Sequence, residues 1–346
     1  MLDDNVNDRK MQHIDIALKD DEIDRHKNYF DSIRLTHRAL PELNADDIDP
    51  SISLFGKRLS FPLLMSPMTG GDHDMLRIIN KNMAVAAEKT GIAFAVGSQR
   101  VMFTNPRALE SFELRRYAPE TLIFANLGAV QLNYGFDKSH CQKAIDILEA
   151  DGLYLHLNPL QEVLQPEGNI DFSGLSDKIK NVTESVGKPI ILKEVGCGIS
   201  PADVDLALEC GITTFDIAGS GGTSWSRIEN VRQITGDKWK LGITFQDWGI
   251  PTPLALQALA GYLDRITVFA SGGLRSGIDM VKAVVLGAKL CGIALPFLRP
   301  ALESPEKVID VIDRLKKEFT LTMFLLGIKD VASLHRNTAL IRKSAF

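Results

Sequence analysis

From residue 60 onward, short runs of apolar and β-branched residues alternate with longer segments of helical period. This alternation is typical of parallel strands joined by crossover helices. Eight such runs occur, at residues 61–66, 92–97, 122–126, 153–157, 189–195, 213–218, 266–271 and 290–294. Eight βα units in about 235 residues match a (β/α)8 barrel, whereas a doubly wound sheet more often stops near six strands. The pattern therefore predicts an α/β fold of the TIM-barrel type.

The segments around the barrel suggest three parts. Residues 1–59 form a polar N-terminal extension, residues 60–303 the barrel, and residues 304–346 C-terminal helices. Gly91, Gly152, Gly211 and Gly287 each follow an amphipathic stretch, where a glycine can end a helix in the left-handed conformation. The apolar stretch FTLTMFLLG at 319–327 either packs against the barrel wall or buries a subunit contact.

The composition of the chain limits the classes of protein and the cellular compartments that fit it. The 346 residues are 45% hydrophobic and 24% charged, which is ordinary globular usage, and the net charge of −5 gives no field suited to nucleic acid or a membrane surface. The first ten residues, MLDDNVNDRK, are acidic where a signal peptide is basic, so we expect a cytoplasmic protein. The spacing of Cys141, Cys197, Cys210 and Cys291 fits neither a zinc ribbon nor a redox pair, so we expect reduced core thiols.

Glycine-rich segments follow the sixth and seventh predicted strands, at 219–224 and 271–277. Backbone N–H groups in such loops, with the N-terminus of the following helix, form a phosphate cradle. A single loop of this kind is more often a tight turn, but two in adjacent units favour phosphate. Arg275 is then either a phosphate ligand or a solvated charge at the rim.

Lys193 lies inside an otherwise apolar predicted strand, IILKEVG, where an unpaired ammonium is costly. Three interpretations stay open: a Schiff-base nucleophile, a donor to an electron-rich cofactor ring, or an ion pair with Glu194. Strand alternation places Lys193 and Glu194 on opposite faces, which weakens the ion pair.

The densest polar cluster follows the fourth predicted strand and holds His156, Asn158, Gln161 and Glu162. A lone histidine at a strand end is usually structural, but these neighbours carry amide and carboxylate groups. One carboxylate cannot form an all-protein metal cage, yet it can hold a Mg²⁺ whose other ligands are water and substrate phosphate. The cluster therefore indicates a phosphorylated ligand.

Several stronger signatures are missing from the sequence. It contains no Walker A motif, complete GxGxxG, HExxH, nucleophile elbow or CxxC. The three tryptophans are not interleaved with basic residues, so nucleic-acid stacking has no support.

Taken together, the motifs resemble one family, the flavin-dependent type 2 isopentenyl diphosphate isomerases. The resemblance covers nearly the whole chain. It rests on Arg9-Lys10 with His13, MTGG at 68–71, GSQR at 97–100, ANLG at 125–128, HLNPLQE at 156–162, KEVGCGIS at 193–200, DIAGSGGTSW at 216–225, DWGIPT at 247–252 and SGGLRSG at 271–277.

The resemblance implies interconversion of isopentenyl and dimethylallyl diphosphate in isoprenoid biosynthesis, a 1,3-proton shift without net redox change. It also implies reduced FMN, NADPH as a reductant, Mg²⁺, and a homo-tetramer or homo-octamer. The N-terminal extension is expected to close over the active site.

Residue by residue, the resemblance implies three sets of ligands. The FMN set is Met68, Thr69, Gly70, Ser98, Asn126, Lys193, Ser220, Thr223, Gly272, Gly273, Leu274, Arg275, Ala294 and Leu295. The substrate set is Arg9, Lys10, His13, Ser98, Gln99, Arg100, His156, Asn158 and Gln161, with Glu162 on Mg²⁺. Gln161, His156 and Lys193 are the expected catalytic residues. We hypothesise that the reduced flavin is itself acid and base, because Gln161 does not titrate and Glu162 is assigned to the metal.

Three rival functions fit parts of the pattern. An FMN-dependent oxidase of small hydroxy acids, or another oxidoreductase acting on a phosphorylated substrate, shares the phosphate loops and the lysine. The hydroxy-acid oxidase needs a histidine base late in the barrel, and the only histidine after His156 is His335, in the C-terminal helices. A Schiff-base aldolase using Lys193 and a non-catalytic flavin-binding protein are the others; polar groups gathered at one barrel end disfavour the latter.

Overall fold

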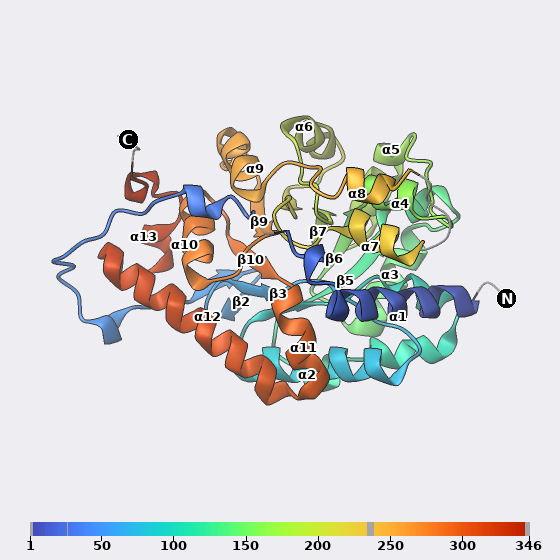
Figure 1. Ribbon diagram of the computed structural model, residues 1–346, viewed down its shortest axis with the longest axis horizontal. Coiled ribbons are helices and arrows are strands. Elements are labelled where there is room, and N and C mark those ends of the chain that lie inside the picture. The colour runs from blue at the N-terminus through green and yellow to red at the C-terminus, as the bar shows by residue number, and fades with distance from the viewer. Residues whose placement is uncertain (1–2, 26, 234–238, 343–346) are drawn as a thin grey trace.

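The eight predicted strands form one closed, parallel barrel in the computed structural model, which describes residues 3–25, 27–233 and 239–342 (Figure 1). The strands are β3 (Leu63–Met65), β4 (Ala93–Ala95), β5 (Ile123–Gly128), β6 (Gly152–Leu157), β7 (Ile190–Glu194), β8 (Thr214–Asp216), β9 (Thr267–Ser271) and β10 (Leu290–Ile293). Each pairs with the next, and β10 pairs with β3. The predicted TIM-barrel fold is confirmed.

Helices surround the barrel and connect successive strands. They are α2 (Asp74–Thr90), α3 (Lys138–Leu148), α4 (Pro159–Leu164), α5 (Leu175–Ser185), α6 (Pro201–Glu209), α7 (Trp225–Arg232), α8 (Leu241–Thr244), α9 (Thr252–Ala258), α10 (Gly277–Val285) and α11 (Leu295–Glu303). After them come α12 (Pro305–Leu326) and α13 (Val331–Leu334).

Local signals explain where several of these helices begin and end. Ser276 and Asp279 form a capping box at the start of α10, directly after the seventh-strand glycines. Gly91 ends α2 in the left-handed conformation, with φ of 66°, as predicted. The same prediction is wrong for Gly152, because Glu149 takes the left-handed position after α3 and Gly152 begins β6.

The N-terminal end of the barrel is closed by a hairpin that the sequence did not predict. Strands β1 (Ile52–Leu54) and β2 (Lys57–Leu59) lie within the polar extension and pair antiparallel. Phe55, at the turn between them, packs edge-on against the rings of Phe124 and Phe269 inside the barrel. The hairpin thus closes this end of the barrel with apolar side chains. We therefore expect a ligand site at the opposite end.

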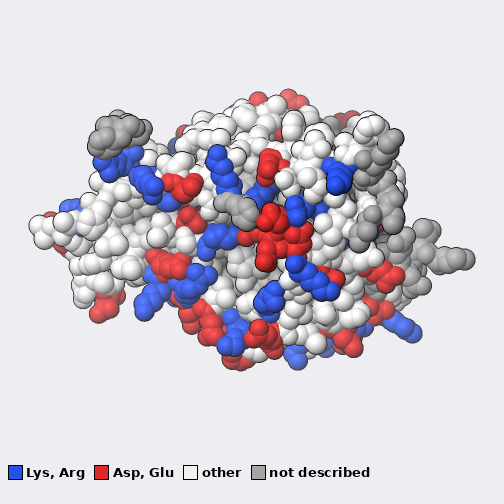
Figure 2. Space-filling model, viewed as in Figure 1, with Lys and Arg blue, Asp and Glu red and all other residues white. Residues whose placement is uncertain are grey.

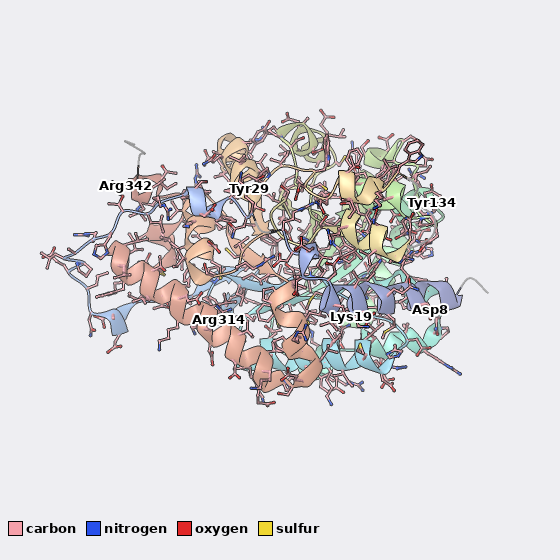
Figure 3. All side chains as sticks on the ribbon, in the orientation of Figure 1. Asp8, Lys19, Tyr29, Tyr134, Arg314 and Arg342 are labelled. Carbon is pink, nitrogen blue, oxygen red and sulfur yellow. The ribbon has the colours of Figure 1, made fainter. Side chains whose placement is uncertain are left out.

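The opposite end is crossed by residues 3–25 and 27–30 of the chain (Figure 1). Helix α1 (Asp3–Lys19) contacts α7, α11 and the 3₁₀ helix η4 (Gln99–Phe103). Figure 3 labels Asp8 and Lys19 on α1 and Tyr29 beyond it, and the segment runs across this face of the molecule. Residues 20–25 and 27–30, which follow α1, are called the strap below.

The C-terminal helix α12 packs against α2, α10 and α11. Phe319, Met323 and Leu326 of its apolar stretch are buried there, whereas Leu321 and Leu325 on its other side are 54% and 38% exposed. The stretch therefore packs on the barrel through one face, and the other face remains open.

Two further observations concern the cysteines and the absence of a membrane-spanning helix among the described residues. The four cysteines are unpaired; Cys141, Cys210 and Cys291 are buried as predicted, but Cys197 is only partly buried and is not a core thiol. Among the helices of the described residues, none combines the length and the apolar character that crossing a bilayer requires.

Candidate active site

A large cavity opens where the barrel strands end, beneath α1 and the strap. The loops after all eight strands contribute to its wall, as expected for a barrel of this kind. Predicted residues that line it are Arg9, Lys10, His13, Met68, Thr69, Ser98, Arg100, Asn126, His156, Asn158, Gln161, Glu162, Lys193, Thr223, Gly272, Gly273, Arg275, Ala294 and Leu295.

Four predicted residues do not line the cavity: Gly70, Gln99, Ser220 and Leu274. Gln99 departs most clearly from its expected role as a substrate ligand. Its side chain is fully buried, donates 2.9 Å to the carbonyl of Ala144 and accepts 2.9 Å from the backbone N–H of Asn126. Gln99 therefore braces η4 against β5 and α3, and its buried amide does not face the cavity as a substrate ligand would. Gly70 accepts a hydrogen bond from Lys10 through its carbonyl.

The two glycine-rich loops pack backbone against backbone beside the cavity. A Cβ on Gly272 would come within 2.1 Å of the carbonyl oxygen of Gly219, and φ there is 91°. A Cβ on Gly222 would meet the backbone nitrogen of Gly273 at 2.7 Å. Only glycines allow this approach, which leaves a concave surface of main-chain groups next to the N-terminus of α10.

The strap covers these loops from outside. The backbone N–H of Ser224 donates 2.7 Å to the carbonyl of Ile23, and that of Arg25 donates 3.1 Å to Gly222. The guanidinium of Arg275 lines the cavity and forms a two-point ion pair with Asp24 of the strap. The Arg275 side chain is therefore ion-paired and is not a solvated charge at the rim. Its role as a phosphate ligand stays a prediction. Acidic side chains gather near the middle of this face with basic side chains around them (Figure 2).

Lys193 projects into the barrel from β7 and reaches the cavity floor. Its ammonium lies 3.1 Å from Asp216 Oδ2 on β8 and donates 3.1 Å to the hydroxyl of Ser271 on β9. Of the three interpretations of Lys193, the ion pair with Glu194 is wrong, because the partner is Asp216. The Glu194 carboxylate points the other way and accepts hydrogen bonds from the N–H groups of Val195, Gly196 and Cys197, although burial raises its pKa to about 7.

His156 is held in one orientation at the end of β6. Its Nδ1 lies 2.7 Å from Asn126 Oδ1, an acceptor, so Nδ1 carries the proton and Nε2 has a free electron pair. Burial and the charges of Lys193 and Lys10 lower the pKa of His156 to about 4. At neutral pH, the imidazole is therefore uncharged before any anion binds. Asn158 does not continue the strand face; it precedes the first residue of α4.

Gln161 is tied to a carboxylate that the sequence did not reveal. Its Nε2 donates 2.9 Å to Oε1 of Glu229 on α7, and His13 Nε2 lies 2.9 Å from the same oxygen. Arg232 pairs with the other oxygen. Burial by itself would raise the pKa of Glu229, but hydrogen bonds from His13 and Gln161 and the charge of Arg232 outweigh it and hold the pKa at about 2. Glu229 is thus an acceptor that orients the Gln161 amide.

Glu162 is buried beside this amide. Its Oε1 accepts 2.9 Å from Asn158 Nδ2, and its Oε2 accepts 2.5 Å from the backbone N–H of Asn169. Each oxygen keeps a further lone pair for a cation. Within the described ranges, no three metal-ligating side chains gather, so a metal here would need ligands from water or substrate.

Cations from separate elements converge on the same cavity. Lys10 of α1 donates 2.8 Å to the carbonyl of Ser98 and also reaches the carbonyl of Gly70. Burial and the neighbouring Arg9 lower the pKa of Lys10 to about 7. Arg100 donates 3.0 Å to Asn169, and Arg9 lies 3.5 Å from Glu167. Neutral carbonyls surround Lys10 where a counter-anion would be expected.

Sequence reasoning missed Asp216 and Glu229. Asp216 carried a usable signal, because it interrupts the apolar strand TTFDIAG one strand away from Lys193. Glu229 carried none: it lies 68 positions from Gln161 on a short polar helix.

Two features of the cavity suit a flavin: the glycine-rich loops, and buried hydroxyls that lack a hydrogen-bond partner among the described residues. The hydroxyls of Ser66 and Thr69 line the cavity, are buried, and have no hydrogen-bond partner within the described part of the chain. Buried hydroxyls are rarely left unpaired, so a ligand with donors and acceptors along its edge fits them. Met68, Leu295 and Leu298 add apolar wall beside these groups.

Comparison with known proteins agrees with this geometry. Residues 3–104 and 162–342 match the FMN-dependent dehydrogenase family. Curated relatives named isopentenyl-diphosphate delta-isomerase occur in Paracoccus zeaxanthinifaciens and Hydrogenovibrio crunogenus. They are 51% identical over 345 residues and 49% identical over 341 residues, covering 99% of both chains in each case. A third, from Nostoc, is 43% identical and covers 96% of this chain and 95% of its own. The chain belongs to the isopentenyl-diphosphate delta-isomerase family, within the FMN-dependent dehydrogenases.

Solved structures of more distant proteins share the fold of this isomerase-family chain. A flavocytochrome b2 variant superposes with a TM-score of 0.69 at 18% identity, covering 96% of this chain and 82% of its own. A mandelate oxidase variant with a monooxide FMN adduct superposes with a TM-score of 0.61 at 17% identity, covering 89% and 87%. At this identity the likeness concerns the barrel alone.

Proposed function

We propose that the protein interconverts isopentenyl diphosphate and dimethylallyl diphosphate in its barrel cavity, with reduced FMN as the acid and base. The observation that carries the proposal is the convergence of Arg9, Lys10 and Arg100 on the cavity that also holds the two glycine-rich loops. One anion would lie on the loops and a second beneath the cations. A phosphorylated flavin and a diphosphate together account for both.

The diphosphate end would be held from three directions. Arg9 and Lys10 approach from α1, Arg100 from η4, and His156 from β6. Ser98, His13 and Asn158 would complete this set, whereas Gln99 is left to its structural role. Because the hydrogen bonds of Lys10 to the described residues end on neutral carbonyls, its charge is available to a phosphate oxygen.

The reacting carbon end needs proton transfer, and the residues assigned to that end supply little acidity, because Lys10 is assigned to the diphosphate end. His156 is neutral, Gln161 does not titrate, and Glu229 stays ionised because its pKa is about 2. Gln161 would orient the alkene or relay a proton, held by Glu229 and Asn158. FMN in its reduced form supplies the acid and base when bound; Lys193, Ser66 and Thr69 would face its ring. Apolar walls and α1 would exclude water.

The remaining parts of the proposal concern metal, reductant and assembly. Glu162 would hold Mg²⁺ through its free lone pairs, with phosphate and water as the other ligands. NADPH would reduce the flavin. The exposed Leu321 and Leu325 on α12 support assembly into a homo-tetramer or homo-octamer, and the unpaired cysteines support a cytoplasmic setting. We also propose that residues 1–59 close the active site, because α1 and the strap contact the cavity loops.

The oxidase alternative has a specific structural difficulty. The one histidine after His156 is His335, and its Nε2 lies 2.9 Å from the carbonyl of Gly287, behind α10. His335 therefore supplies no base to the cavity; among the described residues, the histidines that line it are His13 and His156, so oxidation of a hydroxy acid by hydride transfer to the flavin is disfavoured.

The test uses purified protein loaded with FMN, reduced anaerobically and supplied with Mg²⁺ and isopentenyl diphosphate in D₂O. We expect dimethylallyl diphosphate and deuterium exchange by NMR, both lost when the metal is chelated. A hydroxy-acid substrate that bleaches the flavin, with no isomerisation of the diphosphate, would instead support the oxidase.

A further inference from the structure

Three neighbouring strands place a closed polar triangle on the barrel floor. Lys193 on β7 and Asp216 on β8 are register partners, and Ser271 ends β9. The ammonium lies 3.1 Å from Asp216 Oδ2 and donates 3.1 Å to Ser271 Oγ, and that hydroxyl donates 2.5 Å to Asp216 Oδ1. Each member therefore contacts the other two.

The members of the triangle differ in their access to the cavity. Lys193 and Ser271 line it, whereas Asp216 is 0% exposed and does not. The ring of Tyr154 lies deeper in the barrel, with its centroid 5.9 Å from the ammonium. Burial, followed by the charge of Asp216, raises the pKa of Tyr154 well above its usual value, so the phenol stays neutral. Asp216 thus acts on the cavity only through its two partners.

The charge balance at this floor is close to zero. The ammonium and the carboxylate cancel, and His156, the register partner of Lys193 on β6, is neutral at pH 7. Glu194 faces away from the barrel interior, into the N–H groups of the following loop. A ring above this floor would meet an oriented ammonium N–H and the oxygen of the Ser271 hydroxyl, whose hydrogen is donated to Asp216, with almost no net charge below.

We propose that Asp216 is a positioning residue: it fixes the Lys193 ammonium and the Ser271 hydroxyl against the flavin ring and cancels the charge of the ammonium. The proposal rests on the flavin site proposed above. An uncompensated ammonium would stabilise negative charge on the reduced ring and weaken its hold on protons. The carboxylate therefore keeps the reduced ring basic, which proton exchange with an alkene requires.

The test is the midpoint potential of bound FMN at pH 7 in the wild type and in Asp216→Asn, which keeps the shape and removes the charge. We expect Asp216→Asn to bind reduced FMN about tenfold more tightly relative to oxidised FMN. This change corresponds to a rise of about 30 mV for a two-electron couple. A potential equal to or below that of the wild type, in folded and flavin-loaded Asp216→Asn, would overturn the proposal.

Three further variants show which part of the proposal fails if Asp216→Asn does not give the expected potential. Asp151→Asn removes a salt-bridged carboxylate at the start of β6, away from the cavity, and should leave the potential unchanged. If Asp216→Asn does not fold, Ser271→Ala decides: it leaves the carboxylate charge without its hydroxyl donor, so the potential should fall, and no change rejects the proposal. Lys193→Met should lower the potential. If it does not, the proposed flavin contact of Lys193 itself fails, independently of Asp216.

Discussion

The amide of Gln161 donates a 2.9 Å hydrogen bond to Glu229, a fully buried carboxylate on another helix. The contact fixes which end of the amide is the oxygen, because an ionised carboxylate accepts only. Gln161 Oε1 in turn lies 3.2 Å from Asn158 Nδ2. A residue that cannot titrate is thereby given one defined donor and one defined acceptor on the wall of the cavity.

Substituting Glu229 should therefore impair turnover more than binding. In Glu229→Leu the amide of Gln161 loses its acceptor, and misplacement by about 1 Å typically costs on the order of 100-fold in rate. We expect kcat to fall by about that factor with FMN still bound, measured by steady-state kinetics. Glu167→Gln is the control, because Glu167 pairs with the same Arg232 without touching Gln161. Equal losses of kcat in both variants would contradict the orienting role.

Lys10 should make substrate capture sensitive to pH. Its pKa is lowered to about 7, so the ammonium is fully charged below that pH and loses its charge above it. Since kcat/KM reports the free enzyme, it should fall by up to about tenfold per pH unit above 7. In Lys10→Arg the guanidinium stays charged, and the fall should flatten. Superimposable profiles for the two proteins would show that Lys10 does not meet the diphosphate.

Removing residues 1–12 should separate substrate binding from flavin binding. The deletion takes away Arg9 and Lys10, whereas the strap, which contacts the glycine-rich loops, remains. Each lost charged hydrogen bond is worth about 1.5–3 kcal/mol, so KM should rise by about 100-fold or more. FMN should stay bound, as shown by the visible spectrum after gel filtration. An unchanged KM would make α1 a structural cover only.

The strap should control how fast FMN enters and leaves. Asp24 binds Arg275 over the loops without lining the cavity, so Asp24→Asn should loosen the cover and leave the flavin contacts intact. For a partly exposed ion pair worth up to about 1 kcal/mol, association and dissociation rates should both rise about fivefold, with Kd nearly unchanged. Flavin fluorescence in stopped flow measures both rates, with Asp21→Asn as the control. A faster dissociation rate alone would make Asp24 a binding residue.

The barrel could be predicted from the sequence because its strands are buried on both faces and appear as unbroken apolar runs. The hairpin β1 to β2 could not, since each strand has only three residues and β2 is mostly polar, with Lys57 and Arg58. Its place depends on Phe55 entering the barrel, a contact that only the closed fold creates.

The candidate site was predictable where several residues of one loop act together, as in the 156–162 and 271–277 segments. It was not predictable where partners come from distant helices or adjacent strands. Glu229 reaches Gln161 only because α7 packs beside α4, and Asp216 reaches Lys193 through strand register. Gln99 shows the converse: a motif neighbour of Arg100 turns inward to hydrogen-bond Ala144.

The central claim is that the flavin itself exchanges the proton, with the chain holding both ends of the substrate. It is tested most directly by reconstituting the protein with 5-deazaFMN, which keeps the shape of the ring and changes its proton chemistry at the central nitrogen. We expect the reduced deaza protein to bind isopentenyl diphosphate with nearly normal affinity and to form no dimethylallyl diphosphate, while the reduced FMN protein forms it. Isomerisation at the full rate with the deaza cofactor would contradict the claim and assign the proton to a side chain.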